Sequence, residues 1–499
     1  MSLETAARRT RVGVIYLAIG VLITAASIAV ALLVTPLQQV TVAGEQIGVG
    51  AAAPSLSLSG PGEVDLFGQR MPTMLQFTGP VRPRLTLTRI TLNQQLASMF
   101  SPGHGVTPGP EAIGQSLASG WTRYFAWEAG IVAVGALLLT GAVAGWARFP
   151  LRRTLVLLGA GLVLAEAANA GGIMVTAFSA PGQLRQVGSL TGLVGQAPLP
   201  AVQTAAGAPR TDVQAVVMGD STAAGLGNPL VANPAKLDTA CQRSVDAYAA
   251  DLAAVNNWNV LNLACSGATI QAGILGPQRM ARATAPPQLA QAQKATHASV
   301  VIVSIGANDL GWSGLVRLCA AAGSCDNRAS TAYFQQRLAT FTSQYYQLLQ
   351  QLATLPSRPR VLINLYYNPF DPASQCRDSQ GLNAAKETAL TGLLNALNGV
   401  LSNGAKAASD LPVQPDFTGH ALCDPGPYVQ GVKDRAPLHP TAAGQLAIAL
   451  ADEQALQQAE TTPGGSPGPL APTPGTTATS GPSGPSASAT PAESRPPGR

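Results

Sequence analysis

Charged residues are scarce in this chain, which excludes an ordinary soluble composition. Only 11% of the 499 residues are Asp, Glu, Lys or Arg, about half the share of a soluble globular protein, while 46% are hydrophobic. The formal net charge is +5, and no run of Lys and Arg is interleaved with aromatic residues. The sequence therefore gives no reason to expect nucleic acid as a partner, and its apolar surplus indicates membrane segments.

Cysteine is absent from the amino-terminal part of the chain and from its tail. All six cysteines lie between Cys241 and Cys423. An even number confined to one region predicts disulfide bonds in an oxidising compartment, although buried free thiols in a cytosolic enzyme are the alternative. Pairing of nearest neighbours gives Cys241–Cys265, Cys319–Cys325 and Cys376–Cys423. No C-x-x-C pair occurs and the chain has only four histidines, so we expect no metal site and no cofactor.

Three long apolar segments predict helices that cross a membrane. Val12–Val34 is uncharged over 23 residues, enough for a hydrocarbon core of ~30 Å, and Ala126–Ala147 and Thr154–Phe178 follow it. Arginines precede the first segment, and three more lie in the short link Arg148–Arg153. The positive-inside rule keeps both in the cytoplasm, so everything after residue 178 is expected on the extracytoplasmic side. A cleaved signal peptide in place of the first helix would leave that placement unchanged.

Glu166 and Asn169 lie near the middle of the third apolar segment. An acidic side chain at that depth is costly and is a candidate functional group. The plainer interpretation, which we favour, is a protonated or paired glutamate that faces a neighbouring helix. Small residues such as Gly161 and Ala165 would allow the two helices to pack closely.

The remaining segments differ in composition. Residues 85–92 alternate apolar and polar positions, and Ser55–Ser59 does the same before ending at Gly60-Pro61-Gly62, which predicts a small β-rich extracytoplasmic segment of unassigned chemistry. The tail is dominated by Pro, Gly, Ser, Thr and Ala and is expected to be disordered.

The predicted organisation is a cytoplasmic N-terminus with the first helix (1–34), the β-rich segment (35–125), two membrane helices (126–178), a linker (179–210), an α/β domain (211–460) and the tail (461–499).

Short apolar runs alternate with helical patterns in residues 211–460. The runs predict buried strands of a parallel sheet at Val213–Met218, Asn259–Leu263, Val300–Ile305 and Val361–Leu365. The helical patterns cover Thr331–Leu355, Asn383–Ala407 and Pro440–Ala459. Such alternation predicts a three-layer α/β fold, in which ligands bind at the carboxyl ends of the strands.

Residues suited to catalysis follow three of these strands. Ser221, in Gly219-Asp220-Ser221, comes directly after the first strand and could present its hydroxyl at a helix start. Gly267 follows the second strand and Asn308 the third; a bare N–H and a side-chain amide at these places could donate to a developing oxyanion. His439 precedes Pro440, which can open the last helix. The alternative for each is a structural role in a turn.

The four residues, in this order, make the domain resemble the SGNH hydrolase superfamily, also called GDSL esterases and lipases. The resemblance covers residues 211–460 and points to a membrane-anchored bacterial, actinobacterial-like member. It implies Ser221 as the nucleophile and His439 as the general base. It also implies an oxyanion hole made by the backbone N–H groups of Ser221 and Gly267 with the Asn308 side chain, and a five-stranded parallel sheet between helices.

Two positions depart from the family pattern. Thr222 replaces the leucine that usually follows the serine, which is a mild change. Ala436 stands three residues before His439, where the family usually has the catalytic aspartate. Asp434 could substitute for the aspartate if the loop folds back, or a backbone carbonyl could orient the imidazole. We favour the second alternative, a Ser–His dyad whose histidine is oriented by a backbone carbonyl. His420, close to Cys423, is the one serious rival to His439.

Three functions remain open at this point. The first is hydrolysis of an acyl ester of lipid or cell-envelope glycan through an acyl-enzyme, which we favour. The second is an O-acyltransferase that moves the acyl group to or from an envelope glycan. The third, from another class, is a non-catalytic envelope scaffold. The expected partners are the acyl-ester substrate and the membrane.

Overall fold

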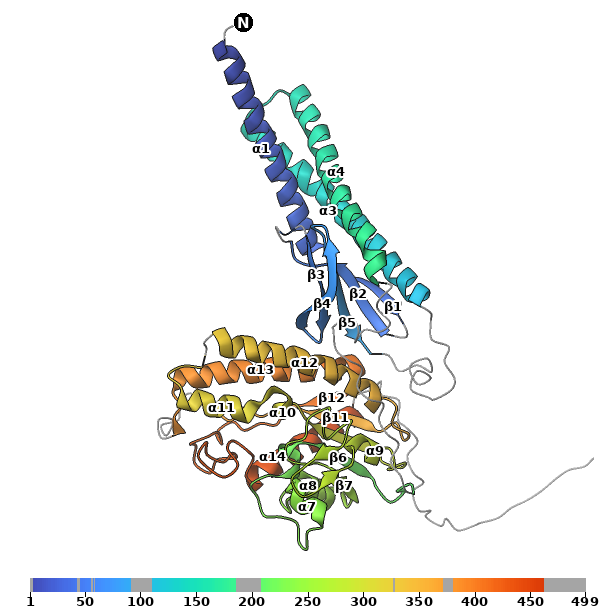
Figure 1. Cartoon of the computed structure of the whole chain (residues 1–499), viewed down its shortest axis with the longest axis vertical. Coiled ribbons are helices and arrows are strands. Elements are labelled where there is room, and N and C mark those ends of the chain that lie inside the picture. Colours follow the sequence, from blue (N-terminus) through green and yellow to red (C-terminus); the bar gives the residue numbers. More distant parts are fainter. Residues whose placement is uncertain are drawn as a thin grey trace, which may run out of the picture. The chain divides into compact units, whose positions relative to one another are not determined.

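The structure is a computed structural model of the chain. It describes residues 3–42, 45–54, 57, 59–90, 110–184, 208–325, 328–370 and 380–461. Residues 1–455 form one compact unit and residues 456–499 another. The first unit holds three long helices, a β-rich segment and an α/β domain (Figure 1).

The α/β domain is built on a five-stranded parallel sheet with the order β12-β11-β10-β6-β7. Its strands are β6 (Ala215–Gly219), β7 (Val260–Asn262), β10 (Val300–Ser304), β11 (Arg360–Asn364) and β12 (Leu411–Val413). All residues of β6 and β10 are buried, as expected for strands covered on both faces. The predicted α/β fold and parallel sheet are confirmed; β12, only three residues long, had not been recognised from the sequence.

Helices cover both faces of this sheet (Figure 1). The long pair is α12 (Arg328–Leu352) and α13 (Ala384–Ala408), close to two of the predicted ranges. Helix α13 begins where the Asn383 side chain accepts the Lys386 N–H and ends at Ser409 in a left-handed conformation. The others are α6 (Ser221–Ala224), α7 (Lys236–Cys241), α8 (Tyr248–Asn256), α9 (Gln288–Ala292), α10 (Ala307–Leu310), α11 (Trp312–Ala321) and α14 (Ala442–Thr461), with a two-stranded ribbon of β8 (Gln278–Arg279) and β9 (Thr284–Ala285).

The β-rich segment forms a second five-stranded sheet, with the order β1-β2-β5-β3-β4. Its strands are β1 (Gln38–Val42), β2 (Glu45–Ala51), β3 (Ser59–Leu66), β4 (Gln69–Thr78) and β5 (Pro83–Arg89). The prediction that a strand ends at Gly60-Pro61-Gly62 was wrong, because β3 runs through these residues. The pairing shifts between Pro61 and Glu63, and such an irregularity lets a strand accommodate proline. Residues 55, 56 and 58 of the predicted serine-rich strand lie outside the described residues.

The three apolar segments are helices long enough to cross a membrane. They are α1 (Leu3–Val34), α3 (Pro110–Trp146) and α4 (Leu151–Leu184). Helix α3 begins well before the predicted residue 126, because its first turns pack on the β-rich segment. There the Trp121 indole donates to the Gly50 carbonyl at 3.0 Å, and Arg123 donates to the Gln39 carbonyl at 3.2 Å.

The polar contact between the apolar helices joins Glu128 to Asn169. The Asn169 amide donates to the Glu128 carboxyl at 2.6 Å, and Glu128 is completely buried. Glu166, which the sequence had singled out, is only half-buried. The expected pairing of Glu166 with a neighbouring helix is not seen, because its buried Oε1 has no hydrogen-bond partner among the described residues; the paired acid is Glu128 on α3. Ala165 is buried in this packing, as expected of a small residue at a helix contact.

The β-rich segment packs on the helices α12 and α13. The Tyr346 hydroxyl donates to the Glu45 carboxylate at 2.5 Å, and Gln350 donates to it at 2.8 Å. Asn403 donates to the Phe67 carbonyl at 3.0 Å. Burial raises the pKa of Glu45, and the two side-chain hydrogen bonds partly oppose that rise. Hydrophobic residues of both sheets belong to one continuous core.

Candidate active site

Ser221 lies immediately after β6, at the first residue of α6. Asp220 caps that helix by accepting the Thr222 N–H at 2.9 Å. The turn depends on Gly219, whose φ is +153°, because a Cβ there would lie 2.3 Å from the Ser304 carbonyl oxygen. Only glycine lets the end of β6 approach β10 so closely. The geometry explains why a serine is presented at this strand end.

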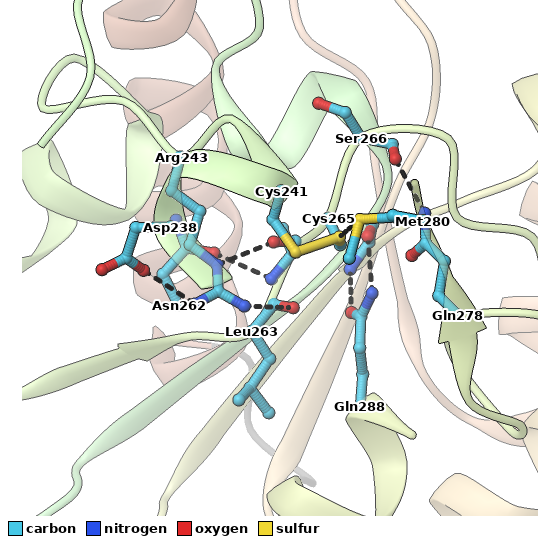
Figure 2. The surroundings of a disulfide bond; sticks show 12 residues. Asp238, Cys241, Arg243, Asn262, Leu263, Cys265, Ser266, Gln278, Met280 and Gln288 are labelled. Atoms are coloured by element: carbon cyan, nitrogen blue, oxygen red, sulfur yellow. Dashed lines mark hydrogen bonds and ion pairs between the residues drawn. A yellow bond between two sulfur atoms is a disulfide. The ribbon is translucent and has the colours of Figure 1, made fainter. Parts of the chain in front are cut away.

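The buried side chain of Gln288 holds the Gly219 peptide unit from both sides. Its amide oxygen accepts the Gly219 N–H at 2.7 Å, and its amide nitrogen donates to the Gly219 carbonyl at 2.9 Å (Figure 2). Nothing in the local sequence pattern marks Gln288, because its partner lies 69 residues earlier in the chain. It fixes the turn that carries Ser221.

The loop after β7 is held by covalent and polar contacts (Figure 2). Cys241 and Cys265 form a disulfide bond, and Arg243 donates to the Ala264 carbonyl at 2.9 Å. Gln278 donates to the Ser266 carbonyl at 2.8 Å. These contacts fix the residues that directly precede Gly267. Cys319 and Cys325 are also bonded, whereas Cys376 lies outside the described residues, so its pairing with Cys423 stays a prediction.

Ser221 and His439 meet across the domain. The Ser221 Oγ and the His439 Nε2 are 2.8 Å apart, and the His439 Nδ1 lies 3.0 Å from the Pro437 carbonyl oxygen. When Nδ1–H donates to that carbonyl, Nε2 is left as the acceptor for the serine hydroxyl. This is the tautomer that a general base requires.

A backbone carbonyl takes the place of a catalytic acid at His439. The Asp434 carboxylate instead accepts the Gly431 N–H at 2.7 Å, within its own turn. Ala436, at the usual position of the acid, is buried at 1% exposure. Of the two alternatives left open by the sequence, the structure has the carbonyl at Nδ1.

The other histidines lie elsewhere. His420 stacks on Tyr428 with 3.9 Å between ring centroids, and its Nδ1 is 3.1 Å from the Gly426 carbonyl. His297 is exposed and precedes β10, at the opposite edge of the sheet, and His104 lies outside the described residues. His439 is therefore the histidine that the fold brings to Ser221.

The three expected oxyanion donors come from consecutive strand ends. Asn308 lies in α10 and lines the same pocket as Ser221 and His439. Its amide donates one hydrogen to the Ala268 carbonyl at 3.0 Å, which leaves the second free. Within the described part of the chain, neither Ser221 nor Gly267 uses its backbone N–H in a hydrogen bond. Gly267 has a φ of +83°, as its turn requires.

No group of three or more His, Cys, Asp or Glu side chains that could hold a metal ion occurs among the described residues. The site offers a serine hydroxyl, an oriented imidazole and amide donors.

Comparison with known proteins identifies this part of the chain. Residues 217–447, which include all four site residues, match the sequence model of the GDSL-like lipase/acylhydrolase family. These residues form a GDSL-like lipase/acylhydrolase domain. A search of curated proteins found no match.

The solved structures to which this chain is similar cover about half of it. An extracellular lipase from Streptomyces rimosus is 23% identical, with a TM-score of 0.41, over 49% of this chain and 99% of its own. A phospholipase A1 from Streptomyces albidoflavus is 25% identical, with a TM-score of 0.38, over 50% of this chain and 99% of its own. A carbohydrate acetylesterase from Sinorhizobium meliloti is 15% identical, with a TM-score of 0.29, over 49% and 99%.

Two adjacent tyrosines after β11 connect the parts of the GDSL-like site, and the sequence did not single them out. The Tyr366 hydroxyl donates to the Asp220 carboxylate at 2.8 Å and accepts the Ala307 N–H at 2.9 Å. The Tyr367 hydroxyl donates to the Leu438 carbonyl at 2.7 Å. Leu438 has a φ of +59°, a strained conformation for leucine, immediately before His439. Tyr367 thus supports the loop that carries His439.

We expect Tyr367→Phe to lower kcat about three- to tenfold, because a net hydrogen bond of about 0.5–1.5 kcal/mol no longer holds the strained loop. The KM should change little, since the loop acts on the base and not on the bound ester. Steady-state ester hydrolysis measures both. Tyr428→Phe is the matched control, because the Tyr428 hydroxyl makes no hydrogen bond within the described residues. Equal losses in the two variants would contradict this role of Tyr367.

Burial dominates the electrostatics of the GDSL-like site. It raises the pKa of Asp220 to about 6 and that of Asp309 to about 7, against the opposing effect of their hydrogen bonds. Asp309 accepts the Ile270 N–H at 3.0 Å and so ties the third strand end to the loop that carries Gly267. Burial also lowers the pKa of His439, while its hydrogen bonds to the Pro437 and Ala436 backbone work in the opposite direction.

The acid limb of kcat/KM should therefore lie below pH 6.5, the ordinary pKa of histidine. A base acts only when neutral, and a lowered pKa keeps His439 neutral to lower pH. A pH–rate profile of ester hydrolysis measures the limb. Asp220, with a pKa of about 6, titrates in the same range. The variant Asp220→Asn removes that titration, so the acid limb should persist in it if the limb belongs to His439. A limb above pH 6.5, or one lost in Asp220→Asn, would contradict the assignment to His439.

Proposed function

We propose that this chain is a membrane-anchored serine ester hydrolase with an extracytoplasmic catalytic domain that cleaves acyl esters of lipid or envelope glycan. The observation that carries the proposal is the 2.8 Å contact of the Ser221 Oγ with the His439 Nε2, whose ring is oriented by the Pro437 carbonyl. Membership of residues 217–447 in the GDSL-like lipase/acylhydrolase family supports the same chemistry.

In the first half-reaction, the Ser221 Oγ attacks the ester carbonyl carbon and His439 Nε2 accepts the hydroxyl proton. The negative charge that develops on the carbonyl oxygen is stabilised by the N–H groups of Ser221 and Gly267 and by the free amide hydrogen of Asn308. Collapse of this intermediate breaks the bond to the alcohol oxygen, which takes the proton back from His439. The product is an acyl ester of Ser221.

In the second half-reaction, water attacks the carbonyl carbon of the acyl-enzyme while His439 Nε2 accepts its proton. Collapse of this intermediate breaks the bond to the Ser221 Oγ, which takes that proton from His439, and the acid is released. A sugar hydroxyl in place of that water would give an O-acyltransferase by the same steps. The fate of the acyl group thus depends on the acceptor, and the two activities differ only in this half-reaction.

The test is to incubate the full-length protein, in detergent, with a fluorophosphonate probe and then with an acyl ester. We expect a stoichiometric adduct on Ser221, absent from Ser221→Ala, together with release of free acid. No adduct on the folded protein would support a non-catalytic scaffold and overturn the proposal. Adding a glycan acceptor and following product masses separates the alternatives, because transfer faster than hydrolysis would indicate the acyltransferase.

The proposed placement has two supports. Three helices are long and apolar enough to cross a membrane, and the α/β domain contains disulfide bonds, which are typical of oxidising compartments. Protease added to intact spheroplasts should digest the α/β domain and spare an epitope fused before α1. Protection of the domain until the membrane is permeabilised would reverse the placement.

A further inference from the structure

The pocket at Ser221 is small and has an apolar wall. Its cavity volume is about 40 Å³. Asn308 and His439 line its polar part beside the nucleophile. Its apolar lining includes Trp312, Tyr366, Leu394 and Leu397. A cavity of this size leaves room for only a small group beside Ser221.

The apolar wall is fixed in place by hydrogen bonds at Tyr366. Its hydroxyl is held by Asp220 at 2.8 Å and by the Ala307 N–H at 2.9 Å. Its backbone N–H donates to the Asn398 side chain at 2.9 Å, and the Asn398 amide donates back to its carbonyl at 2.7 Å. The hydroxyl is thus held by two hydrogen bonds and the backbone by two more, so the ring cannot rotate aside without breaking buried hydrogen bonds, which is costly.

The neighbouring part of the wall belongs to α13. Leu394 and Leu397 lie on the same helix as Asn398 and are buried at 3% and 1% exposure. Both belong to the continuous hydrophobic core, together with Phe341 and Tyr345 of α12. Because the core behind them is close-packed, they have little room to move back for a larger ligand.

We propose that the site takes esters of short acyl groups and that Leu394 and Leu397 set this limit. This inference rests on the proposed function, since it concerns the acyl group that Ser221 receives. The acyl chain is the apolar part of a glycan ester, whose alcohol is a polar sugar. An apolar wall beside the nucleophile therefore suits the acyl group, and its small volume favours an esterase of acylated glycan over a long-chain lipase.

The experiment is a chain-length series of p-nitrophenyl esters, from acetate and butyrate to octanoate and laurate, with the full-length protein. Wild type should lose at least about tenfold in kcat/KM between butyrate and octanoate, because each methylene that a pocket rejects changes the rate by about 10–200-fold. Leu394→Ala and Leu397→Ala should each raise the octanoate-to-acetate ratio about tenfold, as the removed carbons open space at the wall.

Leu401→Ala is the matched control. Leu401 is a completely buried leucine on the same helix and does not line the pocket. Its truncation should destabilise the fold to a similar degree, which thermal unfolding measures, and leave the chain-length ratio unchanged. A change in all three variants would mean that loosened packing, and not the pocket wall, governs the ratio, and the inference would fail.

Labelling of Ser221 by ethyl and octyl fluorophosphonates gives a second readout that needs no turnover. The ethyl probe should react faster with wild type, and the difference should shrink in Leu394→Ala. Hydrolysis of laurate as fast as acetate would overturn the short-acyl limit and leave the proposed function standing. If no ester is cleaved and no probe labels Ser221, the proposed function fails and this inference fails with it.

Discussion

His439→Ala should lower kcat for ester hydrolysis by ~10⁴-fold or more, a loss matched in this chain only by removal of the nucleophile Ser221. The reason is that the Nε2 atom, 2.8 Å from the Ser221 Oγ, is the one base in position to accept the serine proton. The loss should fall on kcat and leave KM nearly unchanged, because the imidazole acts on the reacting hydroxyl. Burst and steady-state kinetics on a soluble ester measure it.

His420→Ala is the control for this variant. His420 is the serious rival to His439 in the sequence, and its ring stacks on Tyr428 instead of reaching Ser221. Its truncation should cost less than tenfold. A large loss in His420→Ala, with activity kept in His439→Ala, would exchange the roles of the two residues and contradict the dyad.

The sequence was most informative about the residues that follow the strand ends, where the candidate catalytic residues lie. Strands β6 and β10 are buried throughout, so their apolar runs stand out, and Ser221 and Asn308 follow each run directly. Parallel strands end at one edge of a sheet, and the order of these residues therefore predicted their meeting in space. The short strand β12 had too few residues for a recognisable pattern.

The supporting contacts could not be predicted because their partners are distant in the chain. Gln288 holds the Gly219 peptide across 69 residues, and Tyr366 reaches Asp220 across 146. A glutamine in a short helix and a tyrosine after a strand carry no local signal of these roles. The same applies to Glu128, which pairs with Asn169 across 41 residues, whereas the sequence drew attention to Glu166.

The group that orients His439 could be predicted from the sequence only in part. The sequence showed that Ala436 could not orient His439, but a backbone carbonyl has no sequence signature. Only the fold of the loop decides which carbonyl faces Nδ1, and Tyr367 helps to set that fold through the Leu438 carbonyl, at 2.7 Å. Carbonyl support fixes the ring tautomer without adding a negative charge to the site.

The second large effect is expected of Asn308→Ala, which should lower kcat by ~10²–10³-fold, as loss of one oxyanion donor does. One amide hydrogen of Asn308 is used by the Ala268 carbonyl, at 3.0 Å, and the other is available to the oxyanion. Because the charge on the carbonyl oxygen develops only in the transition state, kcat and kcat/KM should fall equally. Steady-state kinetics on a short-chain ester measure both parameters.

Asn308→Asp provides the control for shape, since the carboxylate has nearly the same size but no amide hydrogen to donate. It should lose at least as much activity as Asn308→Ala, because its negative charge also repels the oxyanion. Thermal unfolding separates this effect from loss of the contact with Ala268, whose expected cost is only about 0.5–1.5 kcal/mol. A loss below tenfold in both variants, or one confined to KM, would remove Asn308 from the oxyanion hole and leave the charge to the N–H groups of Ser221 and Gly267.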